Sequence, residues 1–266
     1  MKVTASVVTY NTDESELQTC LDSMLNDGIE KVYVSDNSEK DSLRSFCEGR
    51  ERVEYIFNNS NLGYGSGHNI AIRKAREEGS SYHLVINADV YFSRGVIPSI
   101  VEYMESNGDV AMVHPKVFYP NGELQYTVRL LPSPKNLIFR RFLPSSSVEK
   151  MNYTYLLQFA DHDKEMNIPY HQGSFMFFRM SRFDKVGLFD ERFFLYPEDI
   201  DITRRMHKHF RTMYYPKVQV VHKHCAASYK SKKMLLIHMK NMIKYFNKWG
   251  WIFDSERKSW NKRIIE

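Results

Sequence analysis

Short apolar segments rich in β-branched residues alternate with amphipathic segments through the first 115 residues. Residues 3–9 predict a buried strand, and apolar side chains then recur at helical spacing over 17–25. The alternation continues with strands predicted over 31–35, 53–57, 83–86 and 110–113, and with helices that end near Gly49, Glu78 and Asn107. This pattern predicts an α/β fold, with helices flanking a Rossmann-like, mostly parallel central sheet.

A polar cluster follows each of the first four predicted strands, over 9–11, 36–38, 61–69 and 87–89. In open sheets of this kind, ligands bind beyond the carboxyl ends of the strands. Loops are polar in any protein, so one such cluster carries little weight. Four clusters at one edge of a sheet are what a nucleotide pocket needs.

The pattern is less regular after residue 115. Four prolines fall within 119–165, which we interpret as an excursion that faces an acceptor. Strands are predicted over 170–180 and 212–222. Residues 229–266 form a basic amphipathic helical segment that ends in Trp249, Trp251 and Phe253. This segment has two interpretations, contact with an anionic membrane surface or docking of its apolar stripe on the domain.

The composition of the 266 residues is that of an ordinary globular protein, with 42% hydrophobic and 26% charged residues. A net charge of +5 does not indicate a nucleic-acid partner. Cys20, Cys47 and Cys225 are far apart and lack metal-type spacing, which favours reduced thiols in the cytoplasm. We find neither a signal-peptide pattern nor an apolar run near the roughly 20 residues that span a bilayer.

An acidic block over 187–201 sets carboxylates among aromatic residues. A helix that begins near Pro197 would place Glu198, Asp199 and Asp201 at its start. A carboxylate there is suited to act as a general base with a raised pKa. The alternative is a helix cap with a solvated acidic face.

Two further motifs carry candidate chemistry. Asn87 and Asp89 follow a strand and offer oxygen ligands to a divalent cation, or they form a simple turn. His222 and His224 are a further pair of candidate ligands, and we expect at most one of them to reach such a site. The glycines over 63–67 allow close backbone approach to a ligand at a helix start, or form an ordinary tight loop.

Taken in order, these motifs resemble the family 2 glycosyltransferases, whose nucleotide-sugar-binding fold is called GT-A. Residues 7–11 look like the family's opening strand, Asp36-Asn37-Ser38 like its Asp-Asn-x-Ser element, and 61–69 like its glycine loop. Asn87-Ala88-Asp89 is similar to a form of its metal-binding motif, although alanine replaces a frequent proline, so metal affinity is expected to be modest. Residues 173–176 and 187–201 resemble the acceptor-side block. The similarity is strongest to rhamnosyltransferase-like enzymes of bacterial surface polysaccharide (O-antigen) synthesis.

The resemblance implies an inverting transfer of rhamnose or another hexose from a dTDP- or UDP-linked donor to a lipid-linked oligosaccharide or polysaccharide. The alternatives are a sugar nucleotidyltransferase and a non-catalytic sugar-nucleotide-binding module. We expect a GT-A domain over 1–228, divided into a donor half (1–115) and an acceptor half (116–228), and a tail over 229–266. We expect the protein to be peripheral on the inner face of the cell membrane.

The implied site has four parts. Asp199 is the implied catalytic base. Asp89 and His222, with His224 as the rival, are the implied ligands of Mg²⁺ or Mn²⁺. The acceptor side is Gly173, Glu198, Asp201 and Arg204, with Arg204 paired to Asp201. The nucleotide side is Thr9, Asn11, Asp36, Asn61, Gly63, Gly67, Asn69 and Asn87.

Overall fold

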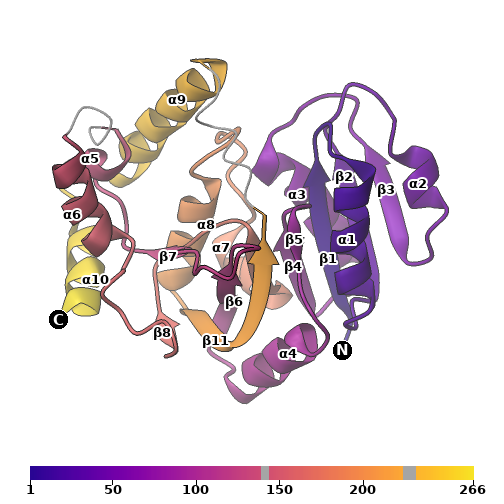
Figure 1. Cartoon of the computed structure of the whole chain (residues 1–266), viewed down its shortest axis with the longest axis horizontal. Coiled ribbons are helices and arrows are strands. Elements are labelled where there is room, and N and C mark those ends of the chain that lie inside the picture. The colour runs from indigo at the N-terminus through magenta and orange to yellow at the C-terminus, as the bar shows by residue number, and fades with distance from the viewer. Residues whose placement is uncertain (139–143, 224–231) are drawn as a thin grey trace.

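The protein is seen here as a computed structural model that describes residues 1–138, 144–223 and 232–266 (Figure 1). His224 and Cys225 lie outside the described residues. Cys20 and Cys47 are buried free thiols. Among the described residues, none of the helices has both the length and the apolar composition that a membrane span requires.

In the described residues, one large sheet of nine strands forms the centre of the molecule. Its order is β3-β2-β1-β4-β10-β6-β11-β5, with β8 paired to β11. Pairing runs parallel through β3, β2, β1 and β4, and again between β6 and β11, whereas β10 is antiparallel to both its neighbours. Six strands therefore share one direction, which confirms the mostly parallel sheet. The strands are β1 (Val3–Thr9), β2 (Lys31–Asp36), β3 (Val53–Phe57), β4 (Tyr82–Ile86), β5 (Val90–Tyr91), β6 (Val110–Phe118), β8 (Met166–Asn167), β10 (Phe175–Arg179) and β11 (Arg211–His222).

Helices cover both faces of this sheet because its strands bury alternate residues on each face. In β10, Phe175 and Phe177 join one cluster with α1 and α4, while Met176 and Phe178 join another with α3, α7 and α8. The helices are α1 (Glu14–Leu25), α2 (Arg44–Glu48), α3 (Tyr64–Glu77), α4 (Val96–Ser106), α7 (Phe183–Val186) and α8 (Glu198–His207). The helix predicted before Gly49 is only the short α2.

A third cluster builds the other end of the molecule. The region interpreted as an irregular excursion contributes short elements to this cluster. The cluster also includes Val128 and Tyr170, one from each strand of a two-stranded sheet in which β7 pairs with β9. Figure 1 shows the tail helices against this end. The elements are β7 (Val128–Arg129), β9 (Tyr170–His171), α5 (Pro134–Leu137), α6 (Ser145–Tyr155), α9 (Lys232–Trp249) and α10 (Ser255–Ile265), while a 3₁₀ turn (Met180–Arg182) precedes α7.

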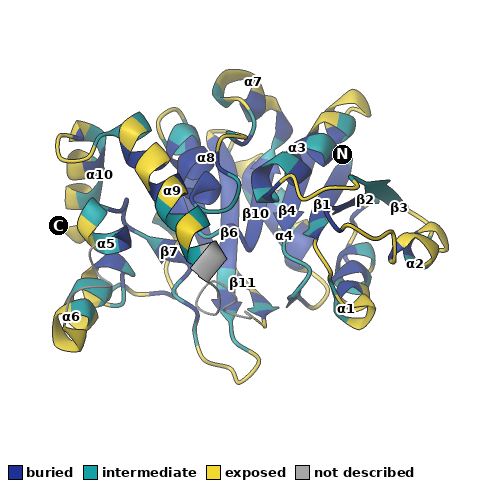
Figure 2. Ribbon diagram, turned by 90° about the horizontal axis from the view of Figure 1, so that it is seen from above, coloured by how far each residue is buried: buried dark blue, intermediate teal, exposed yellow. Residues whose placement is uncertain are grey.

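The tail is two helices that pack on the domain. Met242, Tyr245 and Phe246 on α9 are buried in the third cluster. The opposite side of α9 is exposed, and the colouring in Figure 2 shows this as a strip along the helix. The apolar stripe therefore docks as one of our two interpretations expected, and the outer side remains available to other contacts.

Candidate active site

The carboxyl edge of the sheet gathers the polar segments that the sequence singled out. β1 ends at Thr9, β2 at Asp36 and β11 at His222, and the parallel register places these ends at the same edge as the end of β4. β10 runs the other way, so its first residue, Phe175, pairs with Ile86 at that edge. Gly173 and Ser174 precede β10 and therefore lie at the same edge, beside the end of β4.

Asp199 lies in the first turn of α8, as the acidic block predicted. Its Oδ1 accepts from the backbone N–H of Ile200 at 2.8 Å, and its Oδ2 accepts from that of Gly173 at 3.1 Å. Burial raises the pKa of Asp199, while these two N–H groups and the charge of Arg129 oppose that rise. The pKa of Asp199 is thus raised on balance, and two N–H groups and one guanidinium limit that rise.

Glu198 is buried beside it in a different environment. Its Oε2 has no hydrogen-bond partner among the described residues. Burial, followed by the charge of Asp199, raises the pKa of Glu198 well above its usual value. Two adjacent carboxyls in one buried site do not both ionise readily, and the hydrogen bonds favour Asp199 as the ionised member.

Arg129 is a residue of this site that our sequence reasoning missed. It lies on β7 opposite Tyr170 of β9, and its guanidinium lies 5.6 Å from the Tyr170 ring centroid. Its positive charge lowers the pKa of Asp199. Because the region around it was interpreted as an irregular loop, no periodic signal marked it in the sequence.

Gly173 and Ser174 join Asp199 to the turn that carries Asp89. The N–H of Gly173 donates to Asp199, and the oxygen of Ser174 accepts from the N–H of Asn87 at 3.0 Å. The Tyr64 hydroxyl donates to Gly173 O at 2.6 Å. Burial, followed by the charges of Glu198, Asp199 and Asp89, raises the pKa of Tyr64 well above its usual value, so all three carboxyls act on this hydroxyl.

Asp89 and His222 come together as the sequence predicted. His222 Nε2 lies 3.2 Å from Asp89 Oδ1, and His222 is almost completely buried. A carboxylate oxygen and an imidazole nitrogen are donors that suit Mn²⁺, and no third His, Cys, Asp or Glu joins them in the described part of the chain. Such a pair fits a cation that takes its remaining ligands from phosphate and water. His224, the rival ligand, lies outside the described residues.

Thr9, Asn11 and Asp36 meet at the ends of β1 and β2. The Thr9 hydroxyl is buried without a hydrogen-bond partner among the described residues, so a polar ligand would satisfy it. Asn11 is exposed at φ +50°, and its N–H donates to Ser38 Oγ at 2.8 Å. Asp36 is fully buried and accepts from Ser38 and from the Tyr55 hydroxyl, at 2.7 Å from the latter. Their role in holding a nucleoside stays a prediction.

The first glycine of the loop, Gly63, packs against protein atoms and does not face an open ligand site. Gly63 has φ +88°, and a Cβ there would lie 2.2 Å from Phe194 O. The N–H of Tyr64 donates to the same oxygen at 3.0 Å. At Gly67, the nearest atoms to a Cβ are those of Val8 and Asn37. The glycines therefore allow α3 to approach the acceptor-side block and β1, and of our two interpretations these contacts favour a tight loop over close approach to a ligand.

Asn69 also differs from our expectation. It is buried, donates to Phe189 O and Glu191 Oε1, both at 2.9 Å, and accepts from Phe189 N. Its side chain ties α3 to the acceptor-side block instead of lining a nucleotide pocket. Asn61, in contrast, is exposed and accepts from the Gly63 N–H at 3.1 Å, and Asn87 is half-buried beside Asp89.

Arg204 does not pair with Asp201, which corrects a further expectation. Its guanidinium binds both carboxylate oxygens of Asp254, at 2.6 and 2.7 Å, and lies 4.1 Å from the Trp249 ring centroid. Asp201 is fully buried and is held by Arg205, Lys248 and the Trp249 indole N–H. Arg204 and Asp201 therefore both join α8 to the tail segment, and their proposed contact with an acceptor stays a prediction.

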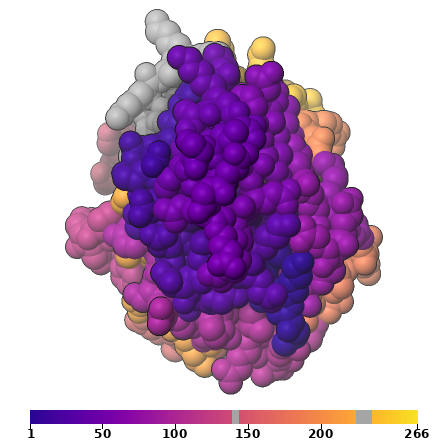
Figure 3. All heavy atoms as spheres, turned by 90° about the vertical axis from the view of Figure 1, so that its right-hand side faces the viewer, coloured from indigo at the N-terminus to yellow at the C-terminus, as the bar shows by residue number. Residues whose placement is uncertain are grey.

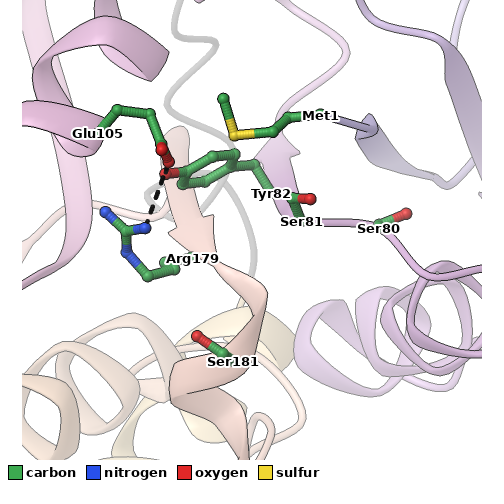
Figure 4. Close-up of a pocket in the computed structure, with 7 residues that line it drawn as sticks. All are labelled: Met1, Ser80, Ser81, Tyr82, Glu105, Arg179 and Ser181. Carbon is green, nitrogen blue, oxygen red and sulfur yellow. Dashed lines mark hydrogen bonds and ion pairs between the residues drawn. The ribbon is translucent and has the colours of Figure 1, made fainter. Parts of the chain in front are cut away.

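A pocket of about 290 Å³ lies at the opposite edge of the sheet (Figure 4). Tyr82 begins β4 and Arg179 ends the antiparallel β10, so both lie at the amino edge. Glu105 accepts from the Tyr82 hydroxyl and lies 3.5 Å from Arg179 Nη1. Because it lies at the amino edge, the pocket is separate from the candidate active site at the carboxyl edge.

The family model of glycosyl transferase family 2 matches residues 4–187. The chain belongs to this family. The match spans the donor-side strands, the Asn87–Asp89 turn and the first part of the acceptor-side block. The resemblance that the motifs predicted is therefore confirmed.

Curated relatives agree with this membership. The rhamnosyltransferase WbbL of Escherichia coli K12 is 27% identical over 224 residues, which cover 81% of each chain. An N-acetylglucosaminyl-diphospho-decaprenol L-rhamnosyltransferase of Mycobacterium tuberculosis is 26% identical over 230 residues, covering 77% of this chain and 74% of that one. The hexosyltransferase Agl10 of Haloferax volcanii is 28% identical over 181 residues, 67% of this chain, but the chain spans only 53% of that relative's length.

Solved structures show the same fold. GalNAc-T7 with UDP, GalNAc and Mn²⁺ superposes with a TM-score of 0.63 at 13% identity, over 83% of this chain and 43% of that one. The mannosyltransferase PcManGT of Pyrobaculum calidifontis, with GDP-Man and Mn²⁺, gives 0.58 at 16% identity, over 91% of this chain and 64% of that one. The expected GT-A fold is confirmed. Figure 3 shows a face of the molecule that belongs largely to N-terminal residues, the part that we expected to form the donor half (1–115).

Proposed function

We propose that this member of the family is an inverting glycosyltransferase that moves a hexose from a nucleoside-diphosphate sugar to a glycan hydroxyl. The observation that carries the proposal is the single stabilised carboxylate of Asp199 at the edge that also holds Asp89 and His222. Thr9, Asn11 and Asp36 are the candidate nucleoside contacts, with Asn61, Gly63 and Asn87 nearby. A UDP- or dTDP-linked sugar suits this site because the Asp36 carboxylate can accept a hydrogen bond from the ring N–H of the pyrimidine.

Asp199 is the proposed base. Its ionised oxygens accept a proton from an acceptor hydroxyl as that hydroxyl attacks the anomeric carbon from the face opposite the leaving group. One displacement inverts the anomeric centre and needs no second carboxylate nucleophile. Burial and the charge of Asp199 raise the pKa of Glu198, and its protonated form would be able to donate a hydrogen bond to the acceptor. Gly173 positions Asp199 through its N–H, and Gly67 lets α3 lie close to the donor strand.

Asp89 and His222 are the proposed ligands of Mg²⁺ or Mn²⁺. When bound, a divalent cation neutralises the charge of the nucleoside-diphosphate leaving group. Support comes from the 3.2 Å approach of His222 Nε2 to Asp89 Oδ1. Asn87 is not acidic and Ala88 is not proline, so we expect binding of the free cation to be weak.

The acceptor is proposed to be a lipid-linked oligosaccharide or polysaccharide. Support comes from the relatives' names, one of which specifies a diphospho-decaprenol acceptor and two of which specify rhamnosyl transfer. The outer side of α9 and the turn after it carry exposed apolar side chains beside exposed lysines. We propose that this side contacts an anionic membrane on the cytoplasmic face, where such an acceptor is anchored.

The proposal is tested by incubating the protein with UDP- and dTDP-hexoses, Mn²⁺ and a synthetic lipid-diphosphate sugar. Mass spectrometry detects transfer, and NMR of the product gives its anomeric configuration. Transfer with inversion is expected. Retention of configuration would exclude the single displacement, and formation of a nucleotide sugar from a sugar phosphate would favour the nucleotidyltransferase alternative. Binding of donor without any transfer would favour the non-catalytic module.

A further inference from the structure

We propose that Gln125 is a positioning residue that fixes His222 in the one neutral tautomer able to bind a cation. The inference rests on the proposed metal role of Asp89 and His222. Gln125 lies after β6, 97 positions from His222 in sequence, and both side chains are buried. The region around it shows no periodic pattern, so nothing in the sequence alone selects it.

The orientation of the Gln125 amide follows from its neighbours. The backbone oxygens of His222 and Phe118 can only accept hydrogen bonds, so the amide nitrogen must face them. Gln125 Nε2 lies 2.6 Å from His222 O and 3.5 Å from Phe118 O. The amide oxygen, Oε1, is therefore directed at the imidazole, and a flipped amide would place two acceptors against each other.

The tautomer of His222 follows in turn. Gln125 Oε1 lies 3.0 Å from His222 Nδ1. Because an amide oxygen only accepts, Nδ1 must carry the hydrogen, and in the neutral ring Nε2 then carries a lone pair. That lone pair lies 3.2 Å from Asp89 Oδ1, so two electron-rich atoms face each other and favour a shared cation. Partners of this kind orient histidine ligands in metal sites.

Thr127 offers a matched control two residues away on the same segment. It is buried, and its hydroxyl lies 2.8 Å from Nε2 of His114, a histidine that we assign no metal role. Thr127→Val and Gln125→Leu each remove a buried hydrogen bond to a histidine. Only Gln125→Leu removes the acceptor at His222 Nδ1.

The first experiment reads the tautomer without metal or sugar. In ¹⁵N-histidine-labelled protein, two-bond ¹H–¹⁵N correlation spectra distinguish the two tautomers, and His222→Gln identifies the His222 signals. We expect hydrogen on Nδ1 in the wild type, and the Nε2–H form to appear in Gln125→Leu but not in Thr127→Val. A wild-type His222 with its neutral hydrogen on Nε2, or an unchanged ring in Gln125→Leu, would overturn the proposal.

The second experiment measures binding of Mn²⁺ alone by electron paramagnetic resonance, after thermal unfolding has shown that each variant is folded. We expect Gln125→Leu to weaken Mn²⁺ binding by about 10–100-fold, and Thr127→Val to leave it unchanged. Equal affinity in wild type and Gln125→Leu would contradict the positioning role. If the wild type bound no Mn²⁺, the proposed metal site itself would fail, and the tautomer measurement alone would decide the role of Gln125.

Discussion

The backbone N–H of Gly173 donates to Asp199 Oδ2 at 3.1 Å, and a Cβ on Gly173 would lie 3.3 Å from Asp199 Cβ. This contact joins the start of β10 to the start of α8. It gives Asp199 a stabilising donor, whereas Oε2 of the adjacent Glu198 has none among the described residues. The contact therefore distinguishes two carboxyl groups that the local sequence could not.

The first prediction compares Asp199→Asn with Glu198→Gln. Asparagine cannot accept the acceptor's proton, so we expect turnover to fall by about 10²–10⁴-fold, with donor affinity nearly unchanged. Glutamine is uncharged and can donate a hydrogen bond as a protonated carboxyl does, so we expect Glu198→Gln to lower turnover far less. Steady-state kinetics and donor titration measure both. A larger loss in Glu198→Gln would reverse our assignment.

The second prediction concerns pH. The charge of Arg129 lowers the pKa of Asp199 and thus favours the ionised base. Arg129→Met removes that charge, so the pKa of Asp199 rises and the acidic limb of kcat/KM should move to higher pH. Arg129→Lys, which keeps the charge, should leave the limb near its wild-type position. A limb that stays in place in Arg129→Met would show that Asp199 does not control it.

The third prediction tests the role of Gly63. Gly28 and Gly63 both have positive φ, but of these two only Gly63 has described neighbours within 4 Å of the position that a Cβ would occupy. Gly28→Ala should cost the backbone strain alone, about 1–3 kcal/mol of unfolding free energy. Gly63→Ala should cost more because it also displaces Phe194. Urea unfolding measures both, and equal losses accompanied by weaker donor binding would restore the ligand interpretation.

What could be foreseen from the sequence was local. Short apolar segments rich in β-branched residues predicted the main strands, and the polar strand ends predicted which segments meet at one edge. The pairing of Asp89 with His222 followed only from the family resemblance. The predictions that failed concerned side chains whose partners are distant in the sequence. Asn69 has amide chemistry that suits a ligand or a backbone equally, and only the fold brings Phe189 to it. The Arg204 partner lies 50 residues away, whereas the nearby Asp201 looked suitable by helical spacing.

The fourth prediction concerns this buried ion pair. Arg204→Met leaves Asp254 buried without its main partner, so we expect a loss of about 3–5 kcal/mol in unfolding free energy. Adding Asp254→Asn removes the buried charge and keeps an acceptor for the Arg257 N–H that begins α10. The double variant should recover much of the loss, as a double-mutant cycle from urea unfolding would measure. Additive losses would contradict the coupling.

The last prediction concerns the turn between α9 and α10, where Ile252 is 78% and Phe253 95% exposed. Removing the whole tail is unsuitable as a test because Tyr245 and Phe246 belong to the core. If Phe253 inserts into a bilayer, Phe253→Ala loses about 1.5–3 kcal/mol of burial, or about tenfold or more in binding to anionic vesicles. Phe159→Ala, at an exposed phenylalanine outside the tail, is the control. Vesicle sedimentation that gives equal binding for both variants and the wild type would exclude this turn as the membrane contact.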